Sequence, residues 1–340
     1  MVDKRNGAVG MRWEWDAAFG GVWPGVKRRR VAAPRRIRRL HVGAAQCRGR
    51  RPYQEDRVVA LQEYKLPCRE DQSPASTSGY EASGNDTQRS YFGIFDGHSG
   101  EEVAAMAAGR MHSILAHTLA SNPTPDAKKG DRGDRVSRAL RRSFLKMDKE
   151  LWRWSLMNWD ERYLGGSCAC VAYREGEDLY VANAGDCRAV ISHNGTALPL
   201  SRDHKPDAPG ERERLAAVGA LTAQSKNTTY IVSRECASGL AVSRCLGDIH
   251  FKQLGYLTAE PDVSRTRLEA GHEFLVMACD GVWDVMTNQE AVNVVREFLR
   301  NVERTEEAVE AATAKLIEKA LMKGSGDNLS AVVALIEWDK

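Results

Sequence analysis

Residues 91–100 read YFGIFDGHSG, an apolar strand pattern that stops abruptly on Asp96, Gly97 and His98. An aspartate followed by a glycine is first of all a turn signal, because glycine accepts positive φ and aspartate can bond its own backbone. The alternative is a carboxylate held rigidly at a strand end, where a metal ion or a substrate can meet it. The same design recurs in EFLVMACDGV at residues 273–282. The rest of the chain is needed to decide between a turn and a functional carboxylate.

Strand-like and helical patterns alternate along the chain. We expect strands at residues 91–95, 168–173, 179–184, 187–192, 239–243, 273–279 and 330–338. We expect helices at residues 100–119, 135–154, 210–220, 288–300 and 305–322. Residues 179–195 are predicted to form a hairpin through the turn NAGD, and SHNG supplies the next turn. Successive hairpins and paired helices favour an α+β fold with antiparallel sheet over a doubly wound α/β fold.

The composition is typical of a soluble globular protein, because 42% of the 340 residues are hydrophobic and 28% are charged. No stretch approaches about 18 uncharged apolar residues, and the N-terminus lacks the apolar core of a signal peptide, so we expect no membrane span. Eight cysteines occur without a Cys-x-x-Cys motif. They are expected to be reduced thiols in or near the core of an intracellular protein, located in the cytoplasm, the nucleus or both.

The positive charge is concentrated at the N-terminus. The first 45 residues hold eleven Lys and Arg against three Asp and Glu, about +8, and the total of +3 leaves residues 46–340 near −5. Residues 1–40 are predicted to be a basic, mostly disordered arm that docks acidic partners, acts as a nuclear-import signal, or is only a solvated tail. Because the body is mildly acidic, nucleic acid is not an expected partner. Residues 68–90 are predicted to be an inserted polar surface loop.

Carboxylates gather at the predicted strand ends. They are Glu55, Asp56, Asp96, Asp186, Asp280, Asp284 and Asp327. An isolated charge at the end of a buried strand is costly to desolvate, and converging carboxylates repel one another unless a cation lies between them. A ligand set of oxygens, without Cys or His, is typical of Mg²⁺ or Mn²⁺ and not of Zn²⁺. Taken singly, Asp280 or Asp327 could instead cap a helix or start a turn.

Seven ordered motifs within residues 41–338 resemble those of the protein phosphatase 2C family. The first, GRRPYQEDR, places Arg51 four positions before Glu55, and FGIFDGHSG is similar to the family's Asp-Gly-His signature. NAGDCRAV follows, with Cys187 where the family has Ser. The remaining motifs are SRDHKPDAPGERERLAAVGA, LAVSRCLGD, ACDGVWDVMTNQEAV and GSGDNLSAVVALI. One such motif would be a weak indication, whereas the ordered set is specific.

The resemblance implies a central sandwich of two antiparallel β-sheets flanked by pairs of antiparallel helices, in the four-layer order α-β-β-α. This domain would occupy residues 41–340, and we expect it to be a monomer. The implied architecture agrees with the hairpins and paired helices read from the residue patterns. The flap of the family corresponds to about residues 204–247.

The resemblance also implies a centre of two Mg²⁺ or Mn²⁺ ions, with a weaker third. Asp96 would bridge the two ions, and Asp280 and Asp327 would hold one of them. The other ion would take the Gly97 carbonyl directly and Glu55 through bound water. In this interpretation the Asp-Gly pairs at residues 96–97 and 280–281 supply metal ligands at the ends of their strands.

Three more carboxylates and two cationic side chains complete the implied site. Asp56 would belong to the water network, and Asp186 and Asp284 match the third-metal position. Arg51 would hold two phosphate oxygens with its planar guanidinium, and His98 would give a proton to the departing Ser or Thr alkoxide. Taken alone, His98 is more readily a structural residue, and Arg51 a solvated charge.

The implied activity is the dephosphorylation of phosphoserine and phosphothreonine proteins. A hydroxide bridging the two metals would attack the phosphomonoester directly, with no phosphoenzyme intermediate. Two alternatives remain, an inactive scaffold of the same fold and a hydrolase of small phosphate esters. The sequence departs from the family at LGGSCACV, residues 164–171, and in a longer link before LAVSR. That link belongs to the flap, so selectivity is the property that transfers least from the family.

Overall fold

The computed structural model describes residues 36–67, 88–121, 131–158, 165–235 and 239–339. The predicted arm and polar insert lie outside these ranges, except for residues 36–40 and 88–90. None of the helices in the described ranges combines the length and hydropathy that a membrane span requires. The cysteines in these ranges carry free thiols, and all of them except the half-buried Cys47 are buried, which agrees with the expectation of reduced core thiols.

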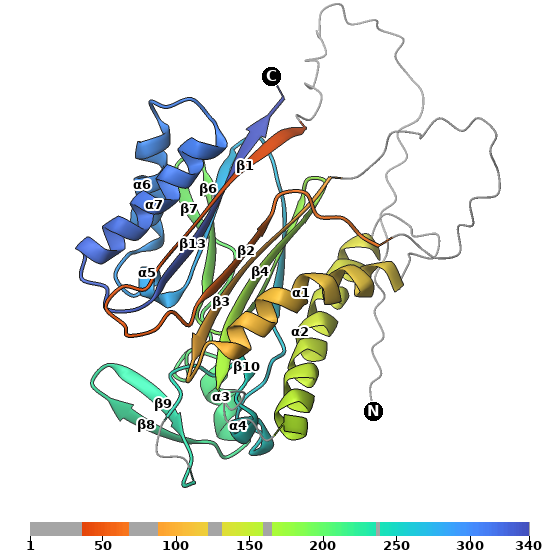
Figure 1. The fold of residues 1–340 in the computed structure, drawn as a ribbon, viewed down its shortest axis with the longest axis vertical. Helices are drawn as coiled ribbons and strands as arrows, with labels where there is room; N and C mark the ends of the chain where they lie inside the picture. Colours follow the sequence, from red (N-terminus) through yellow and green to blue (C-terminus); the bar gives the residue numbers. More distant parts are fainter. Residues whose placement is uncertain (1–35, 68–87, 122–130, 159–164, 236–238, 340) are drawn as a thin grey trace, which may run out of the picture. The chain divides into compact units, whose positions relative to one another are not determined.

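Two antiparallel sheets form the centre of residues 36–339 (Figure 1). The first has the order β1 Ile37–Cys47, β13 Leu329–Trp338, β12 His272–Ala278, β6 Arg188–His193 and β7 Thr196–Pro199. The second has the order β11 Asp262–Arg267, β5 Asp178–Ala184, β4 Gly166–Glu175, β3 Arg89–His98 and β2 Arg57–Leu61, with β10 Leu246–Gly247 beside β4. A separate hairpin consists of β8 Leu221–Ser225 and β9 Thr228–Val232.

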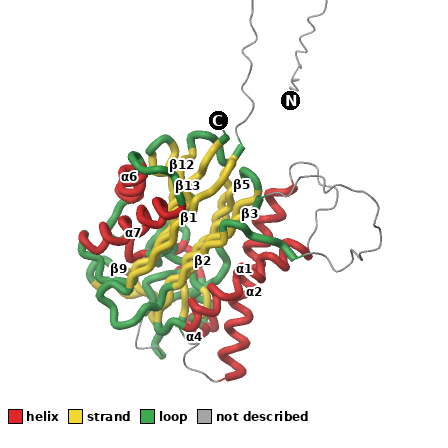
Figure 2. The backbone as a smooth tube through the Cα atoms, turned by 45° about the horizontal axis from the view of Figure 1, so that its top comes forward, coloured by secondary structure: helices red, strands yellow, loops and turns green. Residues whose placement is uncertain are grey.

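Pairs of helices cover the outer faces of both sheets. α1 Glu102–Ser121 and α2 Asp131–Asn158 pack on the second sheet, and α6 Asn288–Leu299 and α7 Glu306–Met322 pack on the first. Figure 2 shows the two pairs on opposite sides of the sheets. Three short helices lie in the connections: α3 Glu211–Ala217, α4 Ile249–Gln253 and α5 Asp280–Trp283.

The apolar stretch at residues 91–95 is explained by burial on both faces of β3. Phe92 and Ile94 point into the core between the two sheets, whereas Tyr91 and Phe95 point into the core beneath α1 and α2. A third core lies between the first sheet and its helices. Because a strand covered on both faces has no polar side, the sequence shows no alternation there. The expected four layers, α-β-β-α, are confirmed.

The hairpin predicted through NAGD is wrong. β5 pairs with β4 and β11 in the second sheet, whereas β6 pairs with β12 and β7 in the first. The residues between β5 and β6 therefore cross from one sheet of the sandwich to the other, and they carry Asp186 to the sheet ends. The SHNG turn is confirmed, since His193 pairs with Thr196 around Asn194 and Gly195, both with positive φ.

Other differences concern segments with weak patterns. Residues 239–243 form no strand, because Leu240 makes only an isolated bridge with Ile231. The arm boundary expected after residue 40 falls inside β1, which begins at Ile37 and pairs along β13. The exposed, Arg-rich start of β1 hides its strand character in the sequence. Similarly, β3 begins at Arg89, inside the expected insert.

Candidate metal centre

Three aspartates from distant segments meet at one end of the sandwich. Asp96 lies near the end of β3, Asp186 lies in the crossing between β5 and β6, and Asp280 begins α5 directly after β12. One carboxylate oxygen of each lies within 4.8 Å of the others. Asp186 is buried and the other two are half-buried. Residues separated by almost two hundred positions thus form one acidic cluster.

The glycines of the two Asp-Gly pairs allow a second chain segment to approach. Gly97 lies inside β3 and Gly281 inside α5, and neither has positive φ, so the turn interpretation is wrong for both. A Cβ on Gly97 would lie 2.5 Å from the Glu55 carbonyl oxygen, and one on Gly281 would lie 2.0 Å from the Asn328 carbonyl oxygen. Each glycine therefore admits the backbone of a segment that carries a predicted ligand, Glu55 in one case and Asp327 in the other.

Asn328 connects these two segments. Its side-chain oxygen accepts a hydrogen bond from the Glu55 backbone N–H at 2.8 Å. Its amide nitrogen donates to the Tyr53 carbonyl at 2.8 Å and to the Arg48 carbonyl at 2.9 Å. The loop that carries Arg51 and Glu55 is thereby fastened to the start of β13. The sequence reading missed Asn328, although it stands beside Asp327 in the quoted motif GSGDNLS.

The remaining residues of the loop lie around the cluster. Arg51 donates from Nη2 to Asp327 Oδ2 at 2.7 Å, and its guanidinium is about half exposed. Glu55 Oε1 accepts from the Gly100 backbone N–H at 2.6 Å. Asp56 is buried and accepts from Ser330 Oγ at 2.7 Å. Burial raises the pKa of Asp56 to about 6, and the Asp327 carboxylate adds to that shift.

The cluster holds more negative charge than its own surroundings stabilise. Burial raises the pKa of Asp96 well above its usual range, and the neighbouring carboxylates of Asp280 and Asp56 raise it further. Asp280 is affected in the same way, by burial and then by Asp186 and Asp284. Hard oxygen donors packed this closely fit divalent cations such as Mg²⁺ or Mn²⁺, whose charge would offset the repulsion.

Lys205 is the cation that contacts this cluster directly. Its ammonium donates to Asp186 Oδ2, and that carboxylate raises the pKa of Lys205 although burial alone would lower it. Asp284 is exposed at the end of α5 and lies near enough to raise the pKa of Asp280. Lys205 was not singled out from the sequence, although it lies in the quoted motif SRDHKPDAPG.

His98 is held by a carboxylate that the sequence reading also missed. Its Nε2 lies 2.6 Å from Asp248 Oδ2. A Cβ on Gly166 would lie 2.0 Å from that Asp248 oxygen and 2.5 Å from His98 Nε2, so glycine leaves room for the pair. Asp248 has a left-handed backbone with φ 48°, a conformation that a residue with a side chain adopts at some cost. The His98–Asp248 contact therefore depends on a strained backbone at Asp248 and on the absence of a side chain at Gly166.

The His98–Asp248 pair stabilises the charged forms of both groups. Asp248 raises the pKa of His98 although burial alone would lower it, and His98 lowers the pKa of Asp248 although burial alone would raise it. The carboxylates of Asp186 and Glu55 also raise the pKa of His98, so the imidazole lies at the edge of the acidic cluster. This arrangement suits a proton donor beside a metal centre.

The structure thus gathers most of the predicted residues at one end of the sandwich. Asp96, Asp186 and Asp280 meet directly, and Asp56, Asp284 and Asp327 surround them electrostatically. Arg51 joins them through its bond to Asp327, Glu55 through its bond to the Gly100 N–H, and His98 because it lies in β3 two residues after Asp96. Gly97 lies in β3 beside Asp96, and the metal-ligand role of its carbonyl stays a prediction.

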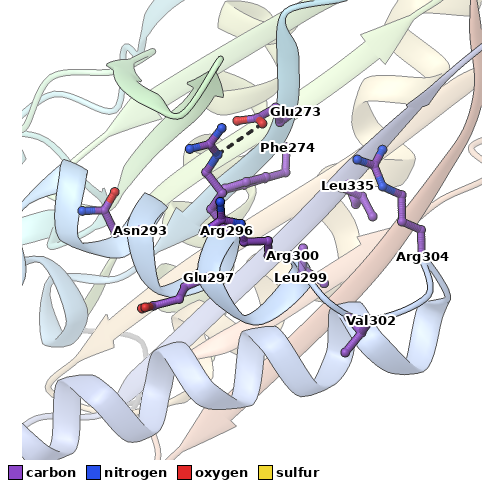
Figure 3. A pocket seen from close by; sticks show the side chains of 10 residues that line it. All are labelled: Glu273, Phe274, Asn293, Arg296, Glu297, Leu299, Arg300, Val302, Arg304 and Leu335. Atoms are coloured by element: carbon purple, nitrogen blue, oxygen red, sulfur yellow. Dashed lines mark hydrogen bonds and ion pairs between the residues drawn. The ribbon is translucent and has the colours of Figure 1, made fainter.

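A cavity elsewhere in the described residues is not this centre. It has a volume of about 540 Å³, lies along α6 (Figure 3), and its wall includes Phe274, Arg296, Arg300, Arg304 and Leu335. None of the predicted site residues lines it. The acidic cluster is recognised by its converging carboxylates and not by the depth of a pocket.

The fold and the acidic centre are those of a class of metal-dependent hydrolases, and comparison with known proteins names the family. Residues 55–329 match the family model described as Protein phosphatase 2C. The chain therefore belongs to the protein phosphatase 2C family, whose members are metal-dependent protein serine/threonine phosphatases.

Relatives and solved structures agree with this assignment. Probable protein phosphatase 2C 2 of Arabidopsis thaliana is 32% identical over 83% of this chain and 70% of its own length. Probable protein phosphatase 2C 32 of Oryza sativa subsp. japonica is 33% identical over 75% of this chain, which spans only 60% of that relative. The crystal structure of serine-threonine phosphatase 2C from Toxoplasma gondii shares the fold, with a TM-score of 0.68 at 22% identity over 90% of this chain and 98% of that one.

Proposed function

We propose that this chain is an active metal-dependent protein serine/threonine phosphatase. The observation that carries the proposal is the convergence of Asp96, Asp186 and Asp280, with carboxylate oxygens within 4.8 Å of one another. Carboxylates this close cannot all ionise without a compensating cation. A protein that only served as a scaffold would not need carboxylates that repel one another, so their presence supports catalytic activity.

The donor set suggests how the ions would be held. Asp96 would serve both ions, Asp280 and Asp327 one of them, and Glu55 with the Gly97 carbonyl the other. When bound, divalent cations supply a nucleophile at neutral pH and neutralise charge on the phosphoryl oxygens. The close backbone approaches at Gly97 and Gly281 keep these segments in register.

A third ion at Asp186 and Asp284 would meet competition. The ammonium of Lys205 already pairs with Asp186, and Asp284 is exposed. The positive charge of Lys205 lies where a cation would otherwise bind, which supports a weak third site.

Transfer of the phosphoryl group to water, and not to a cysteine, is supported by the position of the nearby thiols. Cys168, Cys187 and Cys279 are at most 2% exposed and belong to the core between the sheets. A phosphomonoester bound at the surface of the acidic cluster cannot reach sulfur atoms packed there.

The two cationic side chains are assigned to phosphate binding and proton transfer. Arg51 is about half exposed beside the acidic cluster, and one nitrogen of its guanidinium donates to Asp327. Its other N–H groups remain available to phosphate oxygens. His98 would protonate the departing alkoxide, and Asp248 would be a positioning residue that holds the imidazole through Nε2. Asp248 acts through His98 and needs no contact with substrate.

A comparison of substrates separates the proposed function from its alternatives. Turnover of a phosphothreonine peptide and of p-nitrophenyl phosphate is measured with Mn²⁺, with Mg²⁺ and with EDTA. We expect hydrolysis of both substrates with either metal, a preference for the peptide in kcat/KM, and no turnover in EDTA. Undiminished turnover in EDTA contradicts the metal requirement. No turnover with either metal indicates an inactive scaffold, and turnover of the small ester alone indicates a small-molecule hydrolase.

The leaving group tests the role of His98. His98→Ala should leave Mn²⁺ affinity unchanged but slow the phosphothreonine peptide by about a hundredfold, because an alkoxide needs a proton. p-Nitrophenyl phosphate should slow far less, since its phenolate leaves unprotonated. Equal slowing of the two substrates would exclude His98 as the proton donor.

The basic N-terminal residues support a separate role in addressing or docking. Residues 1–35 lie outside the described structure, and we propose that they direct the protein to the nucleus or to acidic partners. Deletion of these residues should change where a tagged protein accumulates in cells. An unchanged distribution, with unchanged partners in pull-down, would leave only a solvated tail.

The phosphatase domain is proposed to act as a monomer.

A further inference from the structure

Among the described residues, a buried arginine that forms no ion pair lies at the end of the sandwich opposite the metal centre. Arg174, in β4, is only 5% exposed. Its guanidinium donates to neutral acceptors: Nη1 to the Gly176 carbonyl at 2.9 Å, Nη2 to Gln88 Oε1 at 3.4 Å, and both Nε and Nη2 to Ser90 Oγ at 3.4 Å. Within the described ranges, no Asp or Glu forms an ion pair with it. A buried cation with neutral partners alone is costly unless an anion joins it.

The neighbouring arginines show the contrast. Arg89 pairs with Glu175 at 2.9 Å, Arg38 with Glu337 at 3.1 Å, and Arg39 with Glu306 at 3.0 Å. Each of these three is more exposed than Arg174, yet each has a carboxylate. Burial lowers the pKa of Arg174 to about 10, and the more distant Glu177 offsets only part of that effect. Of these four arginines, the most buried one is therefore the one that has no ion pair in the described ranges.

Arg174 lines a cavity whose cations are only partly paired, because Arg174 and Lys65 form no ion pair in the described ranges. The cavity has a volume of about 730 Å³, within the usual range for small-molecule sites. Its described wall contains five cationic side chains and a single carboxylate, that of Glu63. The cationic residues are Arg38, Arg39, Lys65, Arg89 and Arg174. Leu40 and Leu66 add apolar surface.

We propose that this cavity binds the phosphate group of a small molecule, either inorganic phosphate or a phosphate monoester. Arg174 would donate to a phosphate oxygen from the Nη1 N–H that its bond to Gly176 leaves free, and the exposed Lys65 would add a second charge, which suits a dianion better than a single carboxylate. The small exposed fraction of Arg174 means that the anion must enter the cavity, which favours a small ligand over a protein surface.

This site is separate from the metal centre. β3 begins at Arg89 beside the cavity and ends at His98 beside the metal centre. At about 3.3 Å per residue, the two sites lie about 30 Å apart. The cavity site would therefore bind phosphate without using any of the residues assigned to catalysis, and it holds whether or not the proposed phosphatase activity is found.

The test follows amide signals beside Arg174, because phosphate is also expected at the metal centre. Inorganic phosphate and phenylphosphonate, a hydrolysis-resistant monoester mimic, are titrated into the full-length, Mg²⁺-loaded protein while the amide resonances of Gln88 and Gly176 are recorded. We expect saturable shifts of both resonances. Tighter binding of phenylphosphonate would identify a monoester ligand, and tighter binding of inorganic phosphate would identify free phosphate.

Variants assign the shifts to the cavity. Arg174→Met should weaken binding at least about tenfold while the free protein melts no lower than the wild type, because an unneutralised charge is removed. Lys65→Met should weaken binding a few-fold. Arg300→Met is the matched control, since Arg300 lines the other cavity (Figure 3), forms no ion pair in the described chain and should leave binding unchanged.

Two results would overturn the proposal. Absence of saturable shifts at Gln88 and Gly176 with both probes would mean that the cavity takes no phosphate. Equal affinity in the wild type and Arg174→Met would place the bound anion elsewhere. If Arg174→Met fails to fold, Lys65→Met decides, and unchanged affinity in that variant also contradicts the proposal.

Discussion

The two ends of the sandwich differ in how their charged side chains are paired. At the far end, Arg38, Arg39 and Arg89 each pair with a glutamate, and Arg174 alone has no carboxylate in the described structure. At the metal end, carboxylates face one another across 4.8 Å or less. Among the described ion pairs at that end, only Lys205 with Asp186 includes one of the three clustered aspartates, whereas Arg51 with Asp327 and His98 with Asp248 lie around them.

Most charges at the far end are neutralised by side chains of the protein itself. Most charges at the metal end are not, and we infer that a ligand neutralises them. Paired arginines at the far end need no other partner. The carboxylates around Asp96 and Asp280 raise the pKa values of both, and for Asp280 the Lys205 ammonium offsets only part of the increase. A cluster of this kind is stable only when an external cation joins it, and we infer that metal binding is what the acidic end is built for.

The largest effect is expected from removing a charge at the acidic end. Asp280→Asn keeps the shape of the side chain but removes a proposed metal ligand. Turnover of a phosphothreonine peptide should fall about a thousandfold, since metal ions contribute several kcal/mol to the reaction and each 1.36 kcal/mol is a factor of ten. Calorimetric titration should show a matching loss of Mn²⁺ affinity. Activity within a few-fold of wild type would remove Asp280 from the centre.

The next largest effect should come from the backbone approach that assembles the acidic end. Gly281→Ala would place a Cβ 2.0 Å from the Asn328 carbonyl and push the Asp327 segment away from α5. A displacement of about 1 Å can cost about a hundredfold in rate, and we expect a loss of that size in kcat. Gly109→Ala, in α1 with no atom near its new Cβ, is the control and should be fully active. Equal behaviour of the two variants would contradict this packing argument.

A smaller effect is expected at the edge of the cluster. Asp248→Asn should slow the phosphothreonine peptide about tenfold, because the imidazole of His98 loses the carboxylate that orients it. The loss should disappear in a His98→Ala background and should be small for p-nitrophenyl phosphate. Full additivity of the two substitutions would show that Asp248 acts independently of His98.

The smallest effect concerns the N-terminal residues. Because β1 begins at Ile37 and Ile37 is buried, a truncation should end before that residue. Deletion of residues 1–35 should leave peptide turnover within about twofold, since it removes no described strand or helix. Substitution Ile37→Asp is the contrasting variant and should lower the melting temperature. Loss of folding on the shorter deletion would show that the arm packs into the domain.

Much of the acidic centre was predictable from sequence for a physical reason. Carboxylates at the ends of several apolar strands stand out as a set, because converging charges need a cation between them. Lys205, Asp248 and Asn328 were not singled out, since each acts through a contact between segments far apart in the chain. Polar residues in loops have many ordinary explanations, and only the fold shows which partner each of them meets.

The strands and helices could be predicted where their side chains are strongly buried. The order of the strands in the sheets could not be predicted, because it depends on which strands pair. The helix pairs and the strands around residues 91–95 and 330–338 follow from their apolar patterns. The crossing at Asp186 was mistaken for a hairpin turn, because both neighbouring strands are buried on two faces and nothing local indicates their partners. β1 was missed since Arg38 and Arg39 are exposed and give it the look of the arm.

The most direct test of the acidic end compares the thermal stability of wild type and Asp96→Asn, in EDTA and in saturating Mn²⁺. In EDTA the variant should melt higher, because one of several repelling carboxylates is neutralised. A gain of about 1 kcal/mol corresponds to about 1–2 °C in a domain of this size. Mn²⁺ should raise the melting temperature of wild type clearly and that of the variant little. A variant that melts lower in EDTA, or that gains as much from Mn²⁺ as wild type does, would contradict the claim that these carboxylates are held together for a metal.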